Sequence, residues 1–279
     1  MSAIYKSEAG AAEIQRRYQE ALRAWPVPAE QVRVPTREGE TFVVVSGPKE
    51  APPVVLLHGS GANATMWLGD VASWARHFRT YAVDLVGEPG LSAPSRPALA
   101  SDGAARWLDD VLAGLGITGA AFVGISLGGW MALDYATRRP ERVTRLALLC
   151  PGGLGKQTMG WMVRAALLRP FGRWGMRRSV RLATGLEGPE LRSVLDQVVG
   201  VFRQFKPRTE RLPVFSDEAL RGLAMPLLVT VGGRDAMFDS EETARRVRRE
   251  VPHATVNLLP EAGHAIFGQT ESVLAFLRG

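Results

Sequence analysis

The sequence predicts an α/β fold with a mostly parallel central sheet, helices on both of its faces and one helical insertion. Short apolar runs such as 54–57 and 120–124 alternate with amphipathic helical patterns, as expected of parallel strands joined by crossover helices. These runs are apolar on both sides, which indicates strands buried on both faces of a sheet. With 279 residues, of which 46% are hydrophobic, the chain can fill one such domain with a modest insertion.

The predicted elements follow one another from the N-terminus in a regular order. A helix is expected at 11–23, because Pro26 and Pro28 follow it and Ala, Leu and Ile recur at helical spacing. Two alternating runs separated by the turn 37–39 predict a hairpin, and buried runs predict the later strands. The expected strands are 31–36, 41–46, 54–57, 80–84, 120–124, 144–149, 227–231 and 255–259. The expected helices that accompany them are 67–77, 104–115, 128–139, 241–250 and 265–277.

The alternation of strands and helices stops between residues 151 and 213. This stretch is helical in pattern, rich in Trp, Met and Arg, and has no run typical of a strand. Structureless loops longer than about 15 residues are uncommon in compact domains. We therefore expect 151–213 to be a helical cap inserted into a core built from 1–150 and 214–279.

The positive charge of the chain is local. The net charge is +6, yet residues 154–215 alone carry ten Arg and two Lys against four acidic residues. A basic patch can attract anionic surfaces, but neither a zinc-finger spacing nor an RNA-binding aromatic string accompanies it. We therefore expect no nucleic-acid partner.

The cysteine content and the hydropathy of the chain indicate in which cellular compartment the protein is expected. A single cysteine, Cys150, excludes an internal disulfide and a multi-cysteine metal site. No apolar run approaches the roughly 20 residues of a membrane span, and the first residues lack the basic-then-apolar order of a signal peptide. These features predict a cytoplasmic protein without a membrane-spanning segment.

The sequence Gly124-Ile125-Ser126-Leu127-Gly128 fits the motif G-x-S-x-G. It follows the predicted strand 120–124 and opens the helix 128–139, which is the setting of a nucleophile elbow. Such a turn exposes the Ser126 hydroxyl at the carboxyl edge of the sheet. The small residues on either side let strand and helix approach closely. Ser126 is therefore the predicted nucleophile.

A serine hydroxyl needs a base at neutral pH, and the chain has four histidines. Where a nucleophile elbow occurs, the acid and then the histidine follow the serine along the chain. Only His253 and His264 follow Ser126, and His253 lies in a polar loop before a strand. His264, after the last predicted strand, is the expected base.

An acid must orient the imidazole of that histidine. Asp235 follows the strand 227–231 and lies between nucleophile and base in the chain, so it is the expected acid. Asp239 is the nearest rival, but it stands at a predicted helix start, where an N-cap role is simpler. Glu261 is too close in sequence to His264 to be preferred.

The remaining requirement is a pair of backbone donors for a developing oxyanion. The Leu127 N–H, directly after the nucleophile, is the first expected donor. The second is expected from the loop after the strand 54–57, where Ser60 is preferred and Gly61 is the alternative. His58 in the same loop is interpreted as a structural side chain that braces it.

These motifs resemble those of the α/β-hydrolase family. The stretches GPKEAPPVVLLHGSGANATMW, SWARHFRTYAVDLVGEPGLS, GISLGGW, VFSDEALRGLAMPLLVTVGGRDAMFD and LPEAGHAIF are similar to carboxylesterases of the naproxen-esterase type. The resemblance implies an α/β-hydrolase fold and a Ser-His-Asp carboxylesterase that needs no metal or cofactor. It falls on Ser126, Asp235, His264 and the loop at Ser60, and it is weakest in the predicted cap.

The sequence leaves the substrate open. A carboxylic ester with an apolar acyl or aromatic part is expected, with Trp161, Phe202 and Phe205 of the cap as candidate contacts. The same triad would also serve a lactonase, a carbon–carbon bond hydrolase or an acyl-transferring or cyclising enzyme, and a non-catalytic ligand-binding protein is a further alternative. The segment from Ile4 to Trp25 packs either on the core or on a second subunit, so a homodimer is possible.

Overall fold

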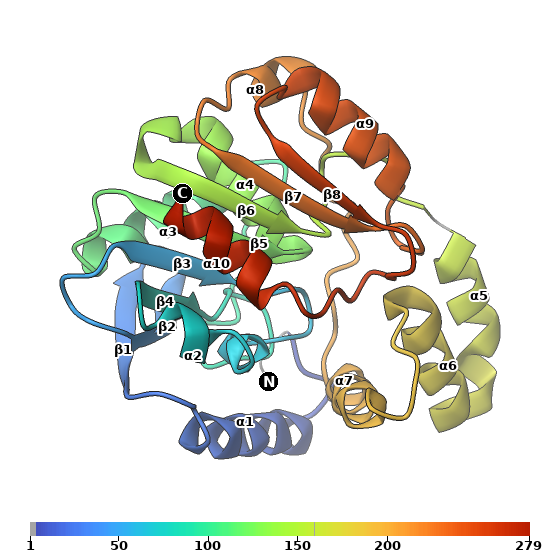
Figure 1. Cartoon of the computed structure of the whole chain (residues 1–279). Coiled ribbons are helices and arrows are strands. Elements are labelled where there is room, and N and C mark those ends of the chain that lie inside the picture. Colours follow the sequence, from blue (N-terminus) through green and yellow to red (C-terminus); the bar gives the residue numbers. More distant parts are fainter. Residues whose placement is uncertain (1–3, 159) are drawn as a thin grey trace.

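A computed structural model describes residues 4–158 and 160–279, and in them eight strands form one sheet (Figure 1). The order across the sheet is β1-β2-β4-β3-β5-β6-β7-β8. Strand β2 pairs antiparallel with β1 and with β4, and all the other neighbours pair parallel, so the sheet is mostly parallel as predicted. The bounds are β1 (Ala29–Thr36), β2 (Gly39–Ser46), β3 (Pro53–Leu57), β4 (Arg79–Val83), β5 (Ala120–Ile125), β6 (Val143–Leu149), β7 (Leu227–Gly232) and β8 (Thr255–Leu259).

Two apolar clusters, one on each face of the sheet, form the core. In β3, Val55 and Leu57 join one cluster while Val54 and Leu56 join the other, because successive side chains of a strand point to opposite faces. The first cluster is covered by α3 (Gly103–Gly114), α4 (Leu127–Arg138), α8 (Asp217–Arg221) and α9 (Ser240–Glu250). The second is covered by α1 (Glu8–Arg23), α2 (Val71–Trp74) and α10 (Thr270–Arg278).

Helix boundaries differ from the sequence prediction in two places. The helix predicted at 67–77 is wrong over most of its length, since a 3₁₀ turn, η1 (Ala64–Trp67), is separated from α2 by Leu68, Gly69 and Asp70. The buried rings of Trp67 and Trp74 pack together across that break, with centroids 5.7 Å apart. Helix α10 begins at Thr270 and not at residue 265, because Gly268 has a positive φ of 71°. Neither α8 nor the 3₁₀ turn η2 (Pro140–Arg142) was predicted.

The described residues between β6 and β7 include α5 (Gly160–Leu168), η3 (Arg169–Phe171), α6 (Gly172–Thr184) and α7 (Arg192–Gln204), which we call the inserted helices. Helices α5 and α6 form a peripheral pair, and α7 lies beside α1 (Figure 1). The Lys6 ammonium donates a hydrogen bond to the Phe202 carbonyl at 2.8 Å. The N-terminal segment therefore packs on its own chain.

No helix among residues 4–158 and 160–279 has both the length and the apolar character required to cross a membrane.

Candidate active site

Ser126 occupies a strained turn between β5 and α4. Its φ of 52° and ψ of −110° lie in a region that residues with a Cβ atom rarely adopt. A Cβ atom at Gly124 would lie 2.6 Å from the Gly128 carbonyl oxygen, and one at Gly128 would lie 2.2 Å from that of Leu57. Only glycine fits at both positions. The close approach of strand and helix thus holds the serine at the carboxyl edge of the sheet.

Three side chains from separate loops meet at this edge. The His264 Nδ1–H donates to Asp235 Oδ2 at 2.8 Å, and the Ser126 hydroxyl donates to His264 Nε2 at 3.0 Å. Asp235 is itself held in place, since its Oδ1 accepts the backbone N–H groups of Met237 and Phe238 at 2.7 and 3.1 Å. Because Asp235 accepts from Nδ1, the lone pair of the neutral imidazole is on Nε2, facing the serine.

The residues that the sequence analysis considered as alternatives for the acid and the base make other contacts. Asp239 caps α9, where its Oδ1 accepts the Glu242 N–H at 2.8 Å. Glu261 pairs with Arg234 on the surface. The ring of His253 bonds the Met225 carbonyl at 3.1 Å. None of these three makes a hydrogen bond to Ser126 or His264 in the part of the chain that the structure describes.

The loop of residues 58–61, which we call the oxyanion loop after its predicted role, lies against Ser126. A Cβ atom built on Gly59 would be 3.7 Å from the Cβ of Ser126. His58 braces the loop as predicted, because its Nδ1–H donates to the Gly59 carbonyl at 2.8 Å while its Nε2 accepts the Leu85 N–H at 3.0 Å. Complete burial lowers the pKa of His58 to about 4, so the ring is neutral near pH 7.

Glu88 holds the other end of the oxyanion loop, and the sequence analysis did not identify it. Its Oε2 accepts the Gly61 N–H at 2.7 Å and the Ser60 hydroxyl at 3.1 Å. The N–H of Gly61 is therefore already used, which favours the N–H of Ser60 as a donor to a substrate. The only available signal was an acidic residue flanked by Gly87 and Pro89 just after a buried strand.

Glu88 is fully buried. Burial raises the pKa of its carboxyl to about 7, although the nearby Arg96 and Arg208 and the two loop donors oppose the shift. Its second oxygen, Oε1, has no hydrogen-bond partner among the described residues. The carboxyl group is thus attached to the loop through one oxygen only.

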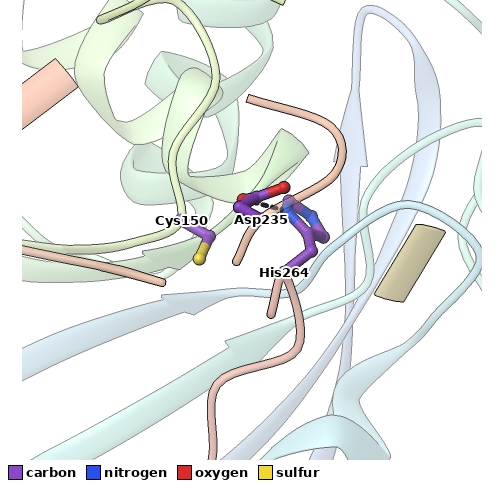
Figure 2. Close-up of side chains that lie close together, drawn as sticks. All are labelled: Cys150, Asp235 and His264. Carbon is purple, nitrogen blue, oxygen red and sulfur yellow. Dashed lines mark hydrogen bonds and ion pairs between the residues drawn. The ribbon is translucent and has the colours of Figure 1, made fainter. Parts of the chain in front are cut away.

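Cys150 directly follows β6, and Figure 2 shows its sulfur near the Asp235–His264 pair. The ligand atoms of these three residues lie within 4.8 Å of one another. Burial and the neighbouring Asp235 raise the pKa of the Cys150 thiol, so it stays protonated and is a poor metal ligand. Asp235 and His264 already bond each other, so this donor set favours a hydrogen-bonded pair over a metal site.

The candidate substrate contacts lie in different settings. Trp161 lines a cavity of about 280 Å³ together with Arg164, Leu182 and Asp235. The ring of Phe202 lies directly over Gly61 of the oxyanion loop. Phe205 is fully buried, and its ring packs against Phe202 and Tyr5, each with a centroid separation of 6.4 Å.

The end of α6 touches the loop that carries His264. The Ala265 N–H donates to the Thr184 carbonyl at 2.8 Å. A Cβ atom at Gly263 would lie 2.8 Å from the Cα of Gly185, so the two backbones are in contact. The inserted helices are thereby joined to the edge where the three side chains meet.

Comparison with known proteins agrees with this architecture. The model of the alpha/beta hydrolase family matches residues 54–276. Carboxylesterase YbfK of Bacillus subtilis is 32% identical over 277 residues, covering 94% of this chain and 92% of YbfK. The uncharacterized carboxylesterase nap of the same organism is 32% identical over 271 residues, covering 89% of this chain and 85% of nap.

Solved structures give the same result. The crystal structure of carboxylesterase CesB (YbfK) from Bacillus subtilis superposes with a TM-score of 0.82 at 31% identity, covering 96% of this chain and 98% of that one. The crystal structure of naproxen esterase from Bacillus subtilis gives a TM-score of 0.78 at 28% identity, covering 98% and 95%. With its parallel sheet, its serine turn and these similarities, the chain belongs to the alpha/beta hydrolase family.

Proposed function

We propose that this protein is a serine carboxylesterase in which Ser126, His264 and Asp235 form the catalytic triad. The observation that carries the proposal is the chain of hydrogen bonds from Asp235 through His264 to the Ser126 hydroxyl, at 2.8 and 3.0 Å. Such a chain activates a hydroxyl as a nucleophile and stabilises the imidazolium that forms. The carboxylesterases that resemble the chain over most of its length support the ester as substrate.

The reaction proceeds through an acyl-enzyme. Ser126 Oγ attacks the ester carbonyl carbon while His264 Nε2 takes the hydroxyl proton. The tetrahedral intermediate then collapses, the C–O bond to the alcohol breaks, and His264 returns the proton to the leaving oxygen. Water attacks the acyl-enzyme with His264 again as the base, which releases the carboxylic acid and restores the serine. None of these steps requires a metal ion or an organic cofactor.

The developing oxyanion is stabilised by backbone N–H groups of Leu127 and Ser60. Leu127 is the first residue of α4, so its N–H is outside the hydrogen bonding of the helix, and the positive end of the helix dipole adds to the field. Ser60 is held by the Glu88 bond to its hydroxyl and by the His58 bond to the preceding carbonyl. One such donor is worth about 2.7–4 kcal/mol in the transition state.

The inserted helices act as the cap, and the core consists of residues 1–150 and 214–279. Trp161 and Phe202 would contact an apolar acyl or aromatic part of the substrate, which is supported by the position of Trp161 at a cavity that includes Asp235 and of Phe202 above the oxyanion loop. Phe205 supports Phe202 from beneath. The cytoplasmic location and the possible homodimer stay predictions from the sequence.

The proposal is tested with Ser126→Ala and p-nitrophenyl esters of increasing acyl length and bulk. The variant should lose at least about 10⁴-fold in kcat, and its circular dichroism should match the wild type. Ser193→Ala, which removes an exposed serine hydroxyl of α7, is the matched control and should keep full activity. Fluorophosphonate should label Ser126 alone.

Activity retained in Ser126→Ala would refute the triad assignment. A wild-type enzyme that cleaves a lactone, a thioester or a diketone but none of the simple esters would refute the ester specificity and leave the triad standing.

A further inference from the structure

The inserted helices expose large apolar side chains along one stretch of the sequence. Of the eight large hydrophobic residues that are exposed in the described chain, five fall between residues 162 and 174, with exposed fractions of 43% to 71%. They lie on α5, η3 and α6, the peripheral pair of Figure 1. We call the surface they form the apolar cap face, and its residues are Met162, Val163, Leu167, Phe171 and Trp174.

The sequence of α5 explains why this surface lacks cover. Its nine residues, GWMVRAALL, contain one charged side chain, Arg164, and none of them is buried. A helix that is apolar around most of its circumference is normally buried in a core or a membrane. Large contiguous apolar surfaces of this kind mark interaction sites. The face is therefore built for a partner.

Four exposed arginines lie on the same elements as the apolar cap face. Arg164, Arg169, Arg173 and Arg178 are exposed, and no carboxylate lies within ion-pair distance of them among residues 4–158 and 160–279. Elsewhere on α6, Arg177 pairs with Asp196 and Arg181 pairs with Glu187. The four arginines thus leave an excess of positive charge beside the exposed Phe171 and Trp174.

We propose that the apolar cap face docks on an anionic lipid surface. Phe and Trp side chains at the face would enter the boundary between headgroups and acyl chains, while the arginines would contact phosphate groups. A second copy of the chain fits less well, because a two-fold interface places a surface against itself and would oppose arginine to arginine. The exposed side chains, with their large apolar area, also fit hydrocarbon better than nucleic acid.

The position of the face suggests what docking is for, and this step rests on the proposed function. Arg164 lies on the face and also lines the cavity that includes Trp161 and Asp235. The other end of α6 contacts the His264 loop through Thr184 and Gly185. A docked enzyme would therefore hold its cavity next to the lipid, where apolar esters dissolve. The substrate class inferred is an ester partitioned into an anionic lipid layer.

Docking is measured by sedimentation with vesicles of phosphatidylcholine alone and of phosphatidylcholine mixed equally with phosphatidylglycerol. The wild type should bind the anionic vesicles at least about tenfold more tightly. The triple variant Leu167→Ser/Phe171→Ser/Trp174→Ser should lose about tenfold or more of that affinity. Its control, Val214→Ser/Phe267→Ser, removes two similarly exposed apolar side chains outside the face and should bind as the wild type does.

The charge contribution is measured separately. Arg169→Gln/Arg173→Gln/Arg178→Gln should abolish the preference for anionic vesicles, whereas Arg23→Gln/Arg76→Gln/Arg106→Gln, with three exposed arginines outside the cap, should retain it. Circular dichroism and hydrolysis of a soluble short-chain ester check that each variant is folded.

Equal binding to both vesicle types, or binding unaffected by the apolar triple variant, would overturn the proposal. A dimer in sedimentation equilibrium that the apolar triple variant dissociates would also overturn it, because the face would then belong to a second copy. Vesicle binding is repeated with Ser126→Ala. If Ser126→Ala still binds vesicles, docking does not depend on esterase activity. The docking proposal and the catalytic proposal are then tested independently of each other.

Discussion

Glu88 is a carboxyl group buried under the oxyanion loop, and replacing it with glutamine should change how stability depends on pH. The carbonyl oxygen of the introduced glutamine can accept the same two hydrogen bonds, from the Gly61 N–H and the Ser60 hydroxyl. Its amide nitrogen would take the place of Oε1, which has no partner among the described residues of the wild type. Glu88→Gln thus preserves shape and acceptor while it removes the ionisation.

The magnitude follows from the pKa of Glu88, which burial raises from 4.5 to about 7. Between these values the folded protein binds more protons than the unfolded chain, so stability is lost as the pH rises from 4.5 through 7. A tenfold change in proton affinity corresponds to about 1.36 kcal/mol, so the full rise in the pKa of Glu88 corresponds to about 3 kcal/mol. Between pH 5 and pH 8, the wild type should lose about 2 to 3 kcal/mol relative to Glu88→Gln.

The assay is urea unfolding of both proteins at pH 5, 6, 7 and 8, followed by tryptophan fluorescence. Asp84 and His58 are also buried and have shifted pKa values, but both proteins contain them, so their contributions cancel in the difference. The control is Glu50→Gln, which changes an exposed carboxyl. A difference between wild type and Glu88→Gln that is the same at pH 5 and pH 8 would refute the reasoning.

Three further changes test the supports of the site. Asp235→Asn should lower kcat by about 10⁴-fold with little loss of stability, because the carboxylate that sets the His264 tautomer is gone. In the control Asp239→Asn, asparagine still caps α9 and kcat should be unchanged. The reverse result would assign the catalytic acid to Asp239. Gly128→Ala should cost about 3 kcal/mol of unfolding free energy or prevent folding, because its Cβ would lie 2.2 Å from the Leu57 carbonyl oxygen. In the control Gly69→Ala, the new Cβ meets nothing within 4 Å and should be tolerated. Equal urea midpoints for the two variants would contradict this prediction. His58→Ala should cost about 2–4 kcal/mol through a cavity and two lost hydrogen bonds. Because the pKa of His58 is lowered from 6.5 to about 4, the wild type should also lose stability relative to His58→Ala as the pH falls from 6.5 toward 4, and His77→Ala should show the same loss relative to His58→Ala.

Local pattern was sufficient for the strands and for the nucleophile. Apolar runs such as 54–57 and 120–124 are strands in the structure because a parallel strand covered on both faces needs apolar side chains on both of its sides. Gly124 and Gly128 flank Ser126 because a Cβ atom at either position would collide with backbone. The strand requirement acts on every buried strand alike. The glycine requirement falls at positions directly beside Ser126, even where the opposing backbone, such as that of Leu57, is distant in the chain, so both are visible in the sequence.

Pattern failed where distant segments decide the outcome. The helix predicted at 67–77 has the right periodicity, yet the packing of Trp67 on Trp74 and the hydrogen bond that the Thr270 hydroxyl donates to Asp70 Oδ1 hold that segment in a broken form. An apolar spacing cannot report the second of these contacts, because Thr270 lies 200 positions from Asp70 in the chain.

The amino-acid sequence by itself determined the sheet, the serine turn and the order in which Ser126, Asp235 and His264 occur. Only the tertiary structure decided that the Gly61 N–H is bound by Glu88, and that an apolar, arginine-bordered face lies uncovered on the cap. The physical reason is that residue types specify local backbone shape and burial, whereas hydrogen-bond partners and exposed surfaces depend on which distant segments come into contact.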